Sequence, residues 1–269
     1  MLLYVFGAVS VLAVLALVLF IPALLPWSLI LAFGAWLFLV VSSVFFLFIV
    51  SLFCIGKPLS SMEGPFLRSL AYHTMDCILT LFGFRIKGEG MEKIPSEPCV
   101  IVCNHLSRFD PMVKFVLMKG RKLSFVSKIE NMQIPIAGPI IQQIGFVPLD
   151  RENSLRALRS IHAAAKLVSE KGYTVGIYPE GTRSRTGELL PFKPGAFVLA
   201  KRAGCPLVIA SIHGTDRYKG RAPFLKTKVQ AEVLEVISSD RVKEMSAEEL
   251  SEACRTRIEE GLKDKKISA

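Results

Sequence analysis

The stretch VIVCNHLSRFDP, residues 100–111, combines a strand-like run with a polar turn. Its first four residues are apolar and mostly β-branched, which is typical of a buried strand, and Pro111 suits the first turn of a helix. Residues 104–110 therefore bridge a strand end and a helix start. His105 can exchange a proton near neutral pH, and Asp110 can fold back to orient one of its ring nitrogens. A purely structural hydrogen bond between the two is the alternative.

Charge divides the 269 residues into two unequal parts. Residues 1–56 contain no Asp, Glu, Lys or Arg, whereas all 33 basic and 23 acidic residues lie from Lys57 onward. The net charge of +10 indicates an anionic partner, such as nucleic acid, a lipid surface or a phosphorylated substrate. Without zinc-finger spacing or a single-strand-binding aromatic motif, no nucleic acid is expected. The six cysteines form no C-x-x-C pair, which favours a reducing compartment and no structural metal.

The N-terminal part holds two long apolar runs, Leu2–Ile21 and Trp27–Ile55, separated by the segment Pro22–Pro26. As a helix, each run can cross about 30 Å of hydrocarbon. We expect residues 1–56 to form a hydrophobic helical hairpin in the membrane, and a re-entrant hairpin in one leaflet is the alternative. Lys57, the first basic residue, places the following domain on the cytoplasmic side by the positive-inside tendency.

Residues 57–84 are expected to contain an interfacial amphipathic helix, because Pro65–Phe84 mixes apolar and charged residues. An ordinary amphipathic core helix is the alternative. From Arg85 onward, short apolar runs alternate with amphipathic stretches. This predicts an α/β domain, residues 85–269, with a largely parallel or mixed sheet flanked by helices. The expected strands are 100–103, 123–127, 145–149, 174–178, 207–212 and 228–236, and the expected helices are 112–118, 136–142, 154–171, 196–203 and 247–263.

A second polar cluster, YPEGTRS at residues 178–184, follows another apolar run. Gly181 permits a close approach of the backbone to a ligand, Thr182 offers a hydroxyl, and Arg183 offers a planar fork that suits phosphate oxygens. A solvated turn is the alternative. The end of a strand is nevertheless where ligands of α/β sheets bind, which favours a functional interpretation.

Two further cations, Lys128 and Arg151, also follow predicted strands. Each could be a solvated surface charge. A structural role is also open to the neighbouring residues Asp150 and Asn153, either of which can cap the helix that begins near Ser154. Together with Arg183, however, these cations at strand ends predict a phosphate pocket.

NHLSRFD at 104–110, GFVPLDR at 145–151 and YPEGTRS at 178–184 resemble, in this order, the first three signature blocks of the glycerolipid acyltransferase family. The similarity covers roughly residues 85 to 215. One departure is Ala210, which stands where the fourth block of the family has a proline. The departure weakens any inference about the acyl pocket from this resemblance.

The resemblance implies that His105 acts as general base on an acceptor hydroxyl, which attacks an acyl thioester, and that Asp110 orients His105. A positioned base contributes roughly 10²- to 10⁴-fold. Ser107 lacks the G-x-S-x-G elbow expected of a hydrolase nucleophile.

By the same resemblance, the acceptor is a lysophospholipid, expected to be 1-acyl-sn-glycerol 3-phosphate acylated at sn-2 to phosphatidate. Acyl-CoA or acyl-carrier protein is the co-substrate, membrane lipids are partners, and no metal or cofactor is expected. Another lysophospholipid, glycerol 3-phosphate, and a non-catalytic lipid-binding role are the alternatives. The residues expected to bind substrate are Asn104, Lys128, Arg151, Glu180, Gly181, Thr182 and Arg183.

Overall fold

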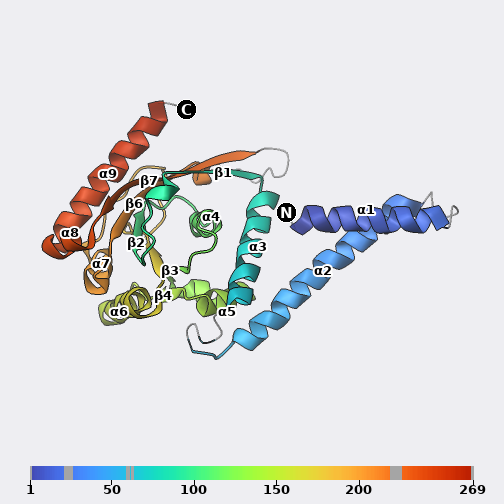
Figure 1. Cartoon of the computed structure of the whole chain (residues 1–269), viewed down its shortest axis with the longest axis horizontal. Coiled ribbons are helices and arrows are strands. Elements are labelled where there is room, and N and C mark those ends of the chain that lie inside the picture. The colour runs from blue at the N-terminus through green and yellow to red at the C-terminus, as the bar shows by residue number, and fades with distance from the viewer. Residues whose placement is uncertain (1, 21–26, 59–60, 62–63, 219–225, 268–269) are drawn as a thin grey trace.

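The computed structural model describes residues 2–20, 27–58, 61, 64–218 and 226–267, and shows an N-terminal helical hairpin beside an α/β domain (Figure 1). The hairpin consists of α1 (Leu2–Phe20) and α2 (Ser28–Cys54), which pack along each other. The expected turn at Pro22–Pro26 lies outside the described residues.

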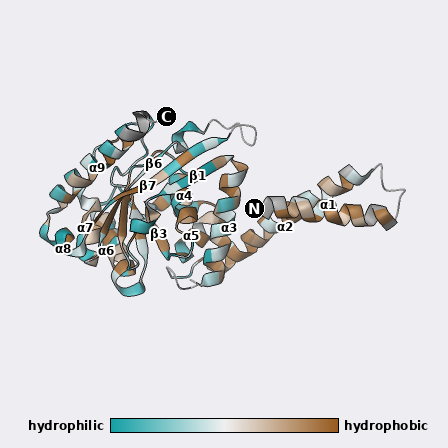
Figure 2. Cartoon of the chain, turned by 45° about the horizontal axis from the view of Figure 1, so that its top comes forward, coloured by the Kyte–Doolittle hydropathy of each residue, from teal (hydrophilic) through white to brown (hydrophobic). Residues whose placement is uncertain are grey.

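Within the described ranges, Ile30–Cys54 is the one helical stretch long and apolar enough to cross a membrane, and Val5–Ala16 is apolar but shorter. The predicted double crossing therefore stays a prediction. Both helices are apolar along their length (Figure 2). Exposed apolar area costs roughly 25 cal/mol per Å² in water, which a lipid environment would remove. Exposed large side chains include Leu12, Leu19, Ile30, Phe33, Phe38, Phe45 and Phe53.

A seven-stranded mixed sheet forms the centre of the domain, in the order β1-β7-β6-β2-β5-β3-β4. β6 and β7 pair antiparallel and all other neighbours pair parallel. The sheet is therefore mixed, as predicted. The strands are β1 (Phe84–Glu89), β2 (Val100–Cys103), β3 (Leu123–Lys128), β4 (Val147–Leu149), β5 (Thr174–Ile177), β6 (Leu207–His213) and β7 (Thr227–Ile237).

Helices cover both faces of the sheet (Figure 1). One face packs against α3 (Pro65–Leu81), α4 (Asp110–Leu117) and α5 (Ala137–Gln143), and the other packs against α6 (Ser154–Lys171), α7 (Val198–Ala203) and α9 (Ala247–Ile267). The short helix α8 (Ser239–Glu244) precedes α9.

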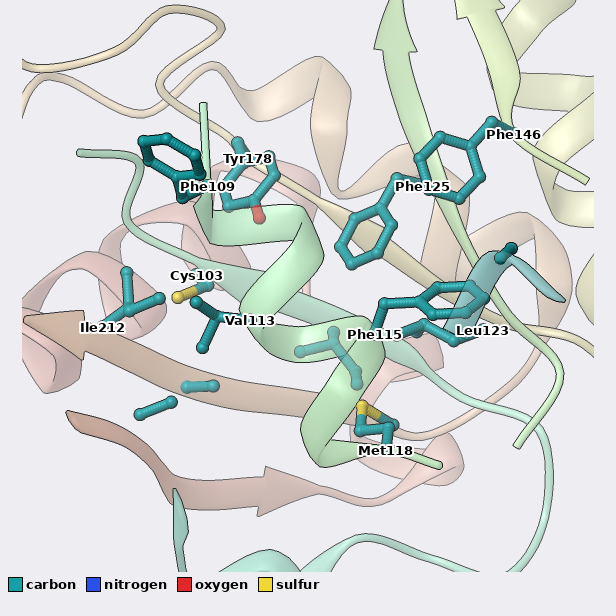
Figure 3. Packing of buried hydrophobic residues seen from close by; sticks show 14 of the residues in the cluster. Cys103, Phe109, Val113, Phe115, Met118, Leu123, Phe125, Phe146, Tyr178 and Ile212 are labelled. Carbon is teal, nitrogen blue, oxygen red and sulfur yellow. The ribbon is translucent and has the colours of Figure 1, made fainter. Parts of the chain in front are cut away.

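Strand β2 shows how the alternation of side chains builds two cores. Val100 and Val102 belong to the core under α6 and α9, whereas Ile101 and Cys103 belong to the core under α4. All four residues are buried, because β2 is a central strand with a parallel neighbour on each side. The core under α4 is rich in aromatic rings, with Phe125 beside Phe146 at a centroid distance of 5.3 Å (Figure 3).

One side of α3 packs onto the α/β domain. Leu67, Ala71 and Leu79 are buried. The guanidinium of Arg68 donates to the carbonyl of Leu123 over 3.0 Å and to that of Ile144 over 3.1 Å. The helix is therefore at least partly a core helix, and its placement at a membrane interface stays a prediction.

Two elements differ from the sequence predictions. The sheet begins at Phe84, one residue before the predicted domain start, with the unpredicted strand β1. β1 lies at the edge of the sheet and is only partly buried, so charged residues break its apolar pattern. The unpredicted α8 has six residues, too few for a clear helical periodicity.

Candidate active site

Two loops that follow neighbouring strands meet at the carboxyl edge of the sheet. Since β2 and β5 pair in parallel, the loops that begin at Asn104 and Tyr178 start side by side. The amide of Ser184 donates to the carbonyl of His105 over 2.8 Å and ties the second loop to the first. The edge predicted to bind ligands therefore brings the first and third sequence blocks together.

His105 and Asp110 form a hydrogen-bonded pair, with 2.7 Å between Nδ1 of His105 and Oδ2 of Asp110. An ionised carboxylate only accepts hydrogen bonds, so the proton of a neutral imidazole sits on Nδ1. The lone pair of Nε2 is then available, and Nε2 has no partner among the described residues. The side chain of His105 is 14% exposed, which leaves it accessible to a small group from a substrate.

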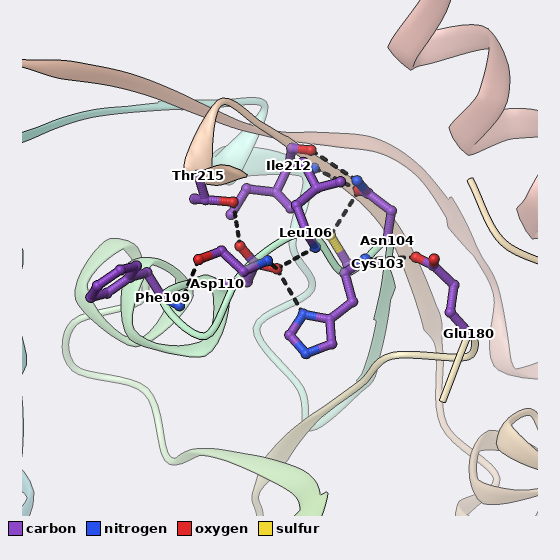
Figure 4. Close-up of polar contacts among 10 residues, drawn as sticks. Cys103, Asn104, Leu106, Phe109, Asp110, Glu180, Ile212 and Thr215 are labelled. Atoms are coloured by element: carbon purple, nitrogen blue, oxygen red, sulfur yellow. Dashed lines mark hydrogen bonds and ion pairs between the residues drawn. The ribbon is translucent and has the colours of Figure 1, made fainter. Parts of the chain in front are cut away.

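Asp110 is fully buried, and four donors surround its carboxylate. Oδ2 also accepts from the amides of Leu106 at 2.7 Å and Ser107 at 2.8 Å. Oδ1 accepts from the hydroxyl of Thr215 at 2.5 Å (Figure 4). A buried carboxylate needs such donors to remain ionised, and charge-assisted bonds of this kind hold a side chain in one orientation. Asp110 is therefore a fixed acceptor for His105.

Burial lowers the pKa of His105 below its usual value of 6.5. The hydrogen bond and charge of Asp110 oppose this effect, while the positive charges of Lys114 and Arg183 add to it. The imidazole is consequently neutral at neutral pH, which is the state that a general base requires.

The imidazole of His105 stacks on the ring of Tyr178, with centroids 4.1 Å apart and planes 19° apart. The ring of Tyr178 also stacks with Phe125 at 6.0 Å. The ammonium of the buried Lys114 lies 4.2 Å from the centroid of the Tyr178 ring, within the range of a cation–π contact. Tyr178 is thus a platform that limits the rotation of the His105 imidazole.

Glu180 is buried and binds backbone amides, which differs from the predicted contact with substrate. Its Oε1 accepts from the amide of His105 at 2.6 Å, and its Oε2 accepts from the amide of Leu190 at 3.2 Å. Burial raises the pKa of Glu180 to about 7, although both amide donors favour the ionised form. The carboxylate therefore positions the two loops, because both of its oxygens are occupied.

Asn104 is another correction to the predicted substrate-binding set. Its side chain is 1% exposed and pairs with the backbone of Ile212 in β6. Nδ2 donates to the carbonyl of Ile212 at 2.9 Å, and Oδ1 accepts from its amide at 2.8 Å (Figure 4). Both ends of the amide are used in fixing β2 to β6, and burial shields the side chain from a substrate.

A cleft of about 690 Å³ borders the loop of His105 and contains part of the predicted set. Gly181 precedes this part in the left-handed region at φ 70°, where glycine is favoured. Thr182 and Arg183 line the cleft, and their binding of substrate stays a prediction. The remaining lining residues are Phe82, Leu106, Ser107, Arg108, Phe109, Ser184, Arg185, Thr215, Asp216 and Tyr218.

Lys128 and Arg151 do not line this cleft. Lys128 is half exposed and forms an ion pair with Glu130, with 2.5 Å between Nζ and Oε1. Lys128 is the last residue of β3 and Arg151 follows β4, and both strands lie beyond β5 in the sheet. The structure therefore separates these two cations from the cleft that Arg183 lines, because the strands that carry them are farther from β2.

Thr215 and Lys114 are residues of the site that sequence reasoning missed. Thr215 follows β6, so its place at the carboxyl edge of the sheet was the available signal. Lys114 lies on a short amphipathic helix, where a lysine resembles a solvated charge. Within the described residues, no group of three or more His, Cys, Asp or Glu could hold a metal ion. The expectation of a metal-free reaction stays a prediction.

Known proteins resemble this chain both in sequence and in structure. The chain is 38% identical over 131 residues to the chloroplastic 1-acyl-sn-glycerol-3-phosphate acyltransferase BAT2 of Brassica napus, covering 48% of this chain and 37% of that protein. It is 32% identical over 185 residues to the chloroplastic 1-acyl-sn-glycerol-3-phosphate acyltransferase LPAT1 of Arabidopsis thaliana, covering 67% and 51%. The aligned part of the chain thus spans between about a third and about a half of the length of these two relatives.

The fold is similar to that of the 1-acyl-sn-glycerophosphate (LPA) acyltransferase PlsC from Thermotoga maritima. The two structures superpose with a TM-score of 0.63 and 27% sequence identity, covering 74% of this chain and 79% of that chain. Residues 85–213 match the Acyltransferase family, and this range includes the His105–Asp110 pair and the loop of Arg183. The chain therefore contains an acyltransferase-family domain at residues 85–213.

Proposed function

We propose that this protein transfers an acyl chain from acyl-CoA or acyl-carrier protein to the sn-2 hydroxyl of 1-acyl-sn-glycerol 3-phosphate. The product is phosphatidate. One observation carries the proposal: a buried, fully hydrogen-bonded Asp110 holds Nδ1 of His105 beside a cleft that Arg183 lines. The related proteins bear the name of this activity.

The chemistry follows from the tautomer of His105. Nε2 takes the proton of the acceptor hydroxyl as the oxygen attacks the carbonyl carbon of the thioester. Asp110 stabilises the imidazolium that forms. The tetrahedral intermediate collapses, the carbon–sulfur bond breaks, and the imidazolium returns its proton to the departing thiolate. The products are an ester and a free thiol, and no acyl-enzyme forms.

The guanidinium of Arg183 binds the phosphate of the acceptor in this mechanism. A planar guanidinium matches two phosphate oxygens and adds positional specificity to attraction. The hydroxyl to be acylated lies one carbon from the carbon that bears the phosphate. Arg183, whose positive charge acts on His105, is therefore suitably placed to bind the phosphate while the hydroxyl lies against Nε2.

The hairpin anchors the catalytic domain to the membrane in this proposal. The apolar stretch Ile30–Cys54 supports it, and Lys57 after α2 supports a cytoplasmic position of the domain. Lysophospholipid from the same membrane would then reach the cleft by lateral diffusion.

A panel of acceptors tests the proposed function. Purified protein is incubated with acyl-CoA or acyl–carrier protein and with lysophosphatidate, glycerol 3-phosphate or lysophosphatidylcholine, and products are identified by mass spectrometry. Formation of phosphatidate is expected. Acylation of another acceptor alone would overturn the substrate assignment. Free fatty acid without an acceptor would indicate a hydrolase, and binding to vesicles without any acylation would indicate a non-catalytic lipid-binding protein.

A further inference from the structure

The cleft beside His105 contains more positive charge than one acceptor phosphate requires. Arg108 comes from the loop after β2, and Arg183 and Arg185 come from the loop after β5. All three side chains are exposed, and in the described part of the chain none makes a hydrogen bond or an ion pair. Among the described residues that line the cleft, Asp216 is the one acidic residue.

Unpaired guanidiniums gathered in one concave site favour anionic ligands, because they repel each other when the site is empty. One phosphate accepts a bidentate contact from one or two arginines. The three guanidiniums of the cleft are therefore suited to two phosphate groups bound at the same time. The proposed reaction has two phosphate-bearing substrates, the acceptor and the carrier of the acyl chain.

The three arginines can be divided between these substrates. In the acceptor, the hydroxyl and the phosphate are on adjacent carbons, so the phosphate must lie close to His105. In the donor, the whole pantetheine arm separates the thioester from its first phosphate. Arg183 directly precedes Ser184, whose amide donates to the carbonyl of His105 over 2.8 Å, and its charge is among the largest that act on His105. Arg108 and Arg185 are thus left for the more distant phosphate.

We propose that Arg108 and Arg185 bind the 4′-phosphate of the phosphopantetheine arm of the acyl donor. This inference rests on the proposed function and deepens it. The phosphate is common to coenzyme A and to acyl-carrier protein, so the same two arginines serve either source. Phe82, Phe109 and Tyr218 form an aromatic cluster on the cleft, with centroids 5.2 to 5.5 Å apart, and offer apolar contact to the chain between phosphate and thioester.

Steady-state kinetics with each substrate varied in turn test the division. Arg108→Gln, Arg185→Gln and the double variant are compared with Arg183→Gln and with Arg159→Gln, an exposed arginine of α6 that does not line the cleft. The double variant should raise the KM for the donor about tenfold or more and leave the KM for the acceptor unchanged. Arg183→Gln should raise the KM for the acceptor and leave the KM for the donor unchanged. Arg159→Gln should change neither KM value.

Both donors are assayed, because acyl-CoA and acyl–carrier protein share the phosphopantetheine phosphate. An equal rise in KM for both supports the shared phosphate, whereas a rise for acyl-CoA alone assigns the arginines to the nucleotide part of coenzyme A and overturns the proposal. A rise in the KM for the acceptor, or an unchanged KM for both donors, also overturns it.

Calorimetry separates this inference from the proposed function. Binding of 4′-phosphopantetheine and of pantetheine is measured with the wild-type protein and with the double variant, without any turnover. The wild-type protein should bind the phosphorylated compound about tenfold more tightly, and the double variant should lose this preference. Equal binding of both compounds by the wild-type protein refutes the phosphate site even if acyl transfer is observed. A preference that depends on the arginines supports it even if lysophosphatidate is not the acceptor.

Discussion

The hydroxyl of Thr215 lies 2.5 Å from Oδ1 of Asp110, and the imidazole of His105 lies 2.7 Å from Oδ2 of the same carboxylate. A residue that follows β6 therefore orients the carboxylate that in turn orients the imidazole of His105. The arrangement joins the ends of two neighbouring strands, β2 and β6, at one carboxylate.

Replacing Thr215 by Val should lower kcat about tenfold, because a hydrogen bond to a charged group is worth about 1.5 to 3 kcal/mol. Thr215→Ser keeps the donor and should retain most activity. The KM values should not change in either variant. Equal activity of the Val variant and the wild type would show that the amides of Leu106 and Ser107 suffice to hold Asp110.

The pH profile of kcat/KM should reflect the lowered pKa of His105. The acid limb, where activity is lost as His105 takes up a proton, should lie below pH 6.5. The same shift makes the folded state lose stability as the pH falls through 6.5, since the unfolded chain binds the proton first. Because Glu180 also titrates, at a pKa of about 7, the profile is repeated with Glu180→Gln. If the acid limb disappears in this variant, the loss of activity at low pH is due to protonation of Glu180 and not of His105.

Two substitutions of Tyr178 separate its ring from its hydroxyl. The hydroxyl is buried and has no hydrogen-bond partner within the described residues, so Tyr178→Phe should preserve stability and kcat. Tyr178→Ala removes the platform under His105 and should lower the free energy of unfolding by about 3 to 5 kcal/mol. Urea denaturation and kcat measure the two effects. A large loss of kcat in the Phe variant would indicate a chemical role for the hydroxyl.

Asn104→Ala should act mainly on stability. It leaves the buried amide and carbonyl of Ile212 without their partners, at a cost of about 1 to 3 kcal/mol each. The exposed Asn131, whose side chain donates to Ser127, provides the control, and Asn131→Ala should have little effect. If Asn104→Ala instead raised the KM for the acceptor at unchanged stability, the substrate-binding role expected from the sequence would be correct.

Local patterns predicted the central elements of the fold well. β2 and α6 have the predicted bounds, because β2 is a short run of apolar residues and α6 has a periodic apolar face. Asn153 caps the start of α6 by accepting from the amide of Arg156, and Gly172 ends it in the left-handed region. The edge strand β1 lacks such a pattern. Only its first residue, Phe84, is buried, and the residues after it are partly or fully exposed.

The part of the site that could be predicted from the sequence is the part formed by residues close together in one loop. His105 and Asp110 are five residues apart, and a turn brings them together. The contact of Thr215 with Asp110 spans 105 residues and depends on the order of strands, which a single sequence does not reveal. Asn104 illustrates the same limit: its side chain turns to β6 because β6 is the neighbour of β2.

The central claim is that Nε2 of His105 accepts the proton of the acceptor hydroxyl. The most direct test is the rate of thiol release from acyl-CoA in the presence of lysophosphatidate, for the wild type, His105→Ala and His105→Gln. His162→Ala is the control, because that histidine is exposed and pairs with Arg202 outside the cleft. Both substitutions of His105 should lower the rate at least about 10²-fold, with thermal unfolding and vesicle binding unchanged. Acyl transfer at the wild-type rate by either variant of His105 would contradict the account.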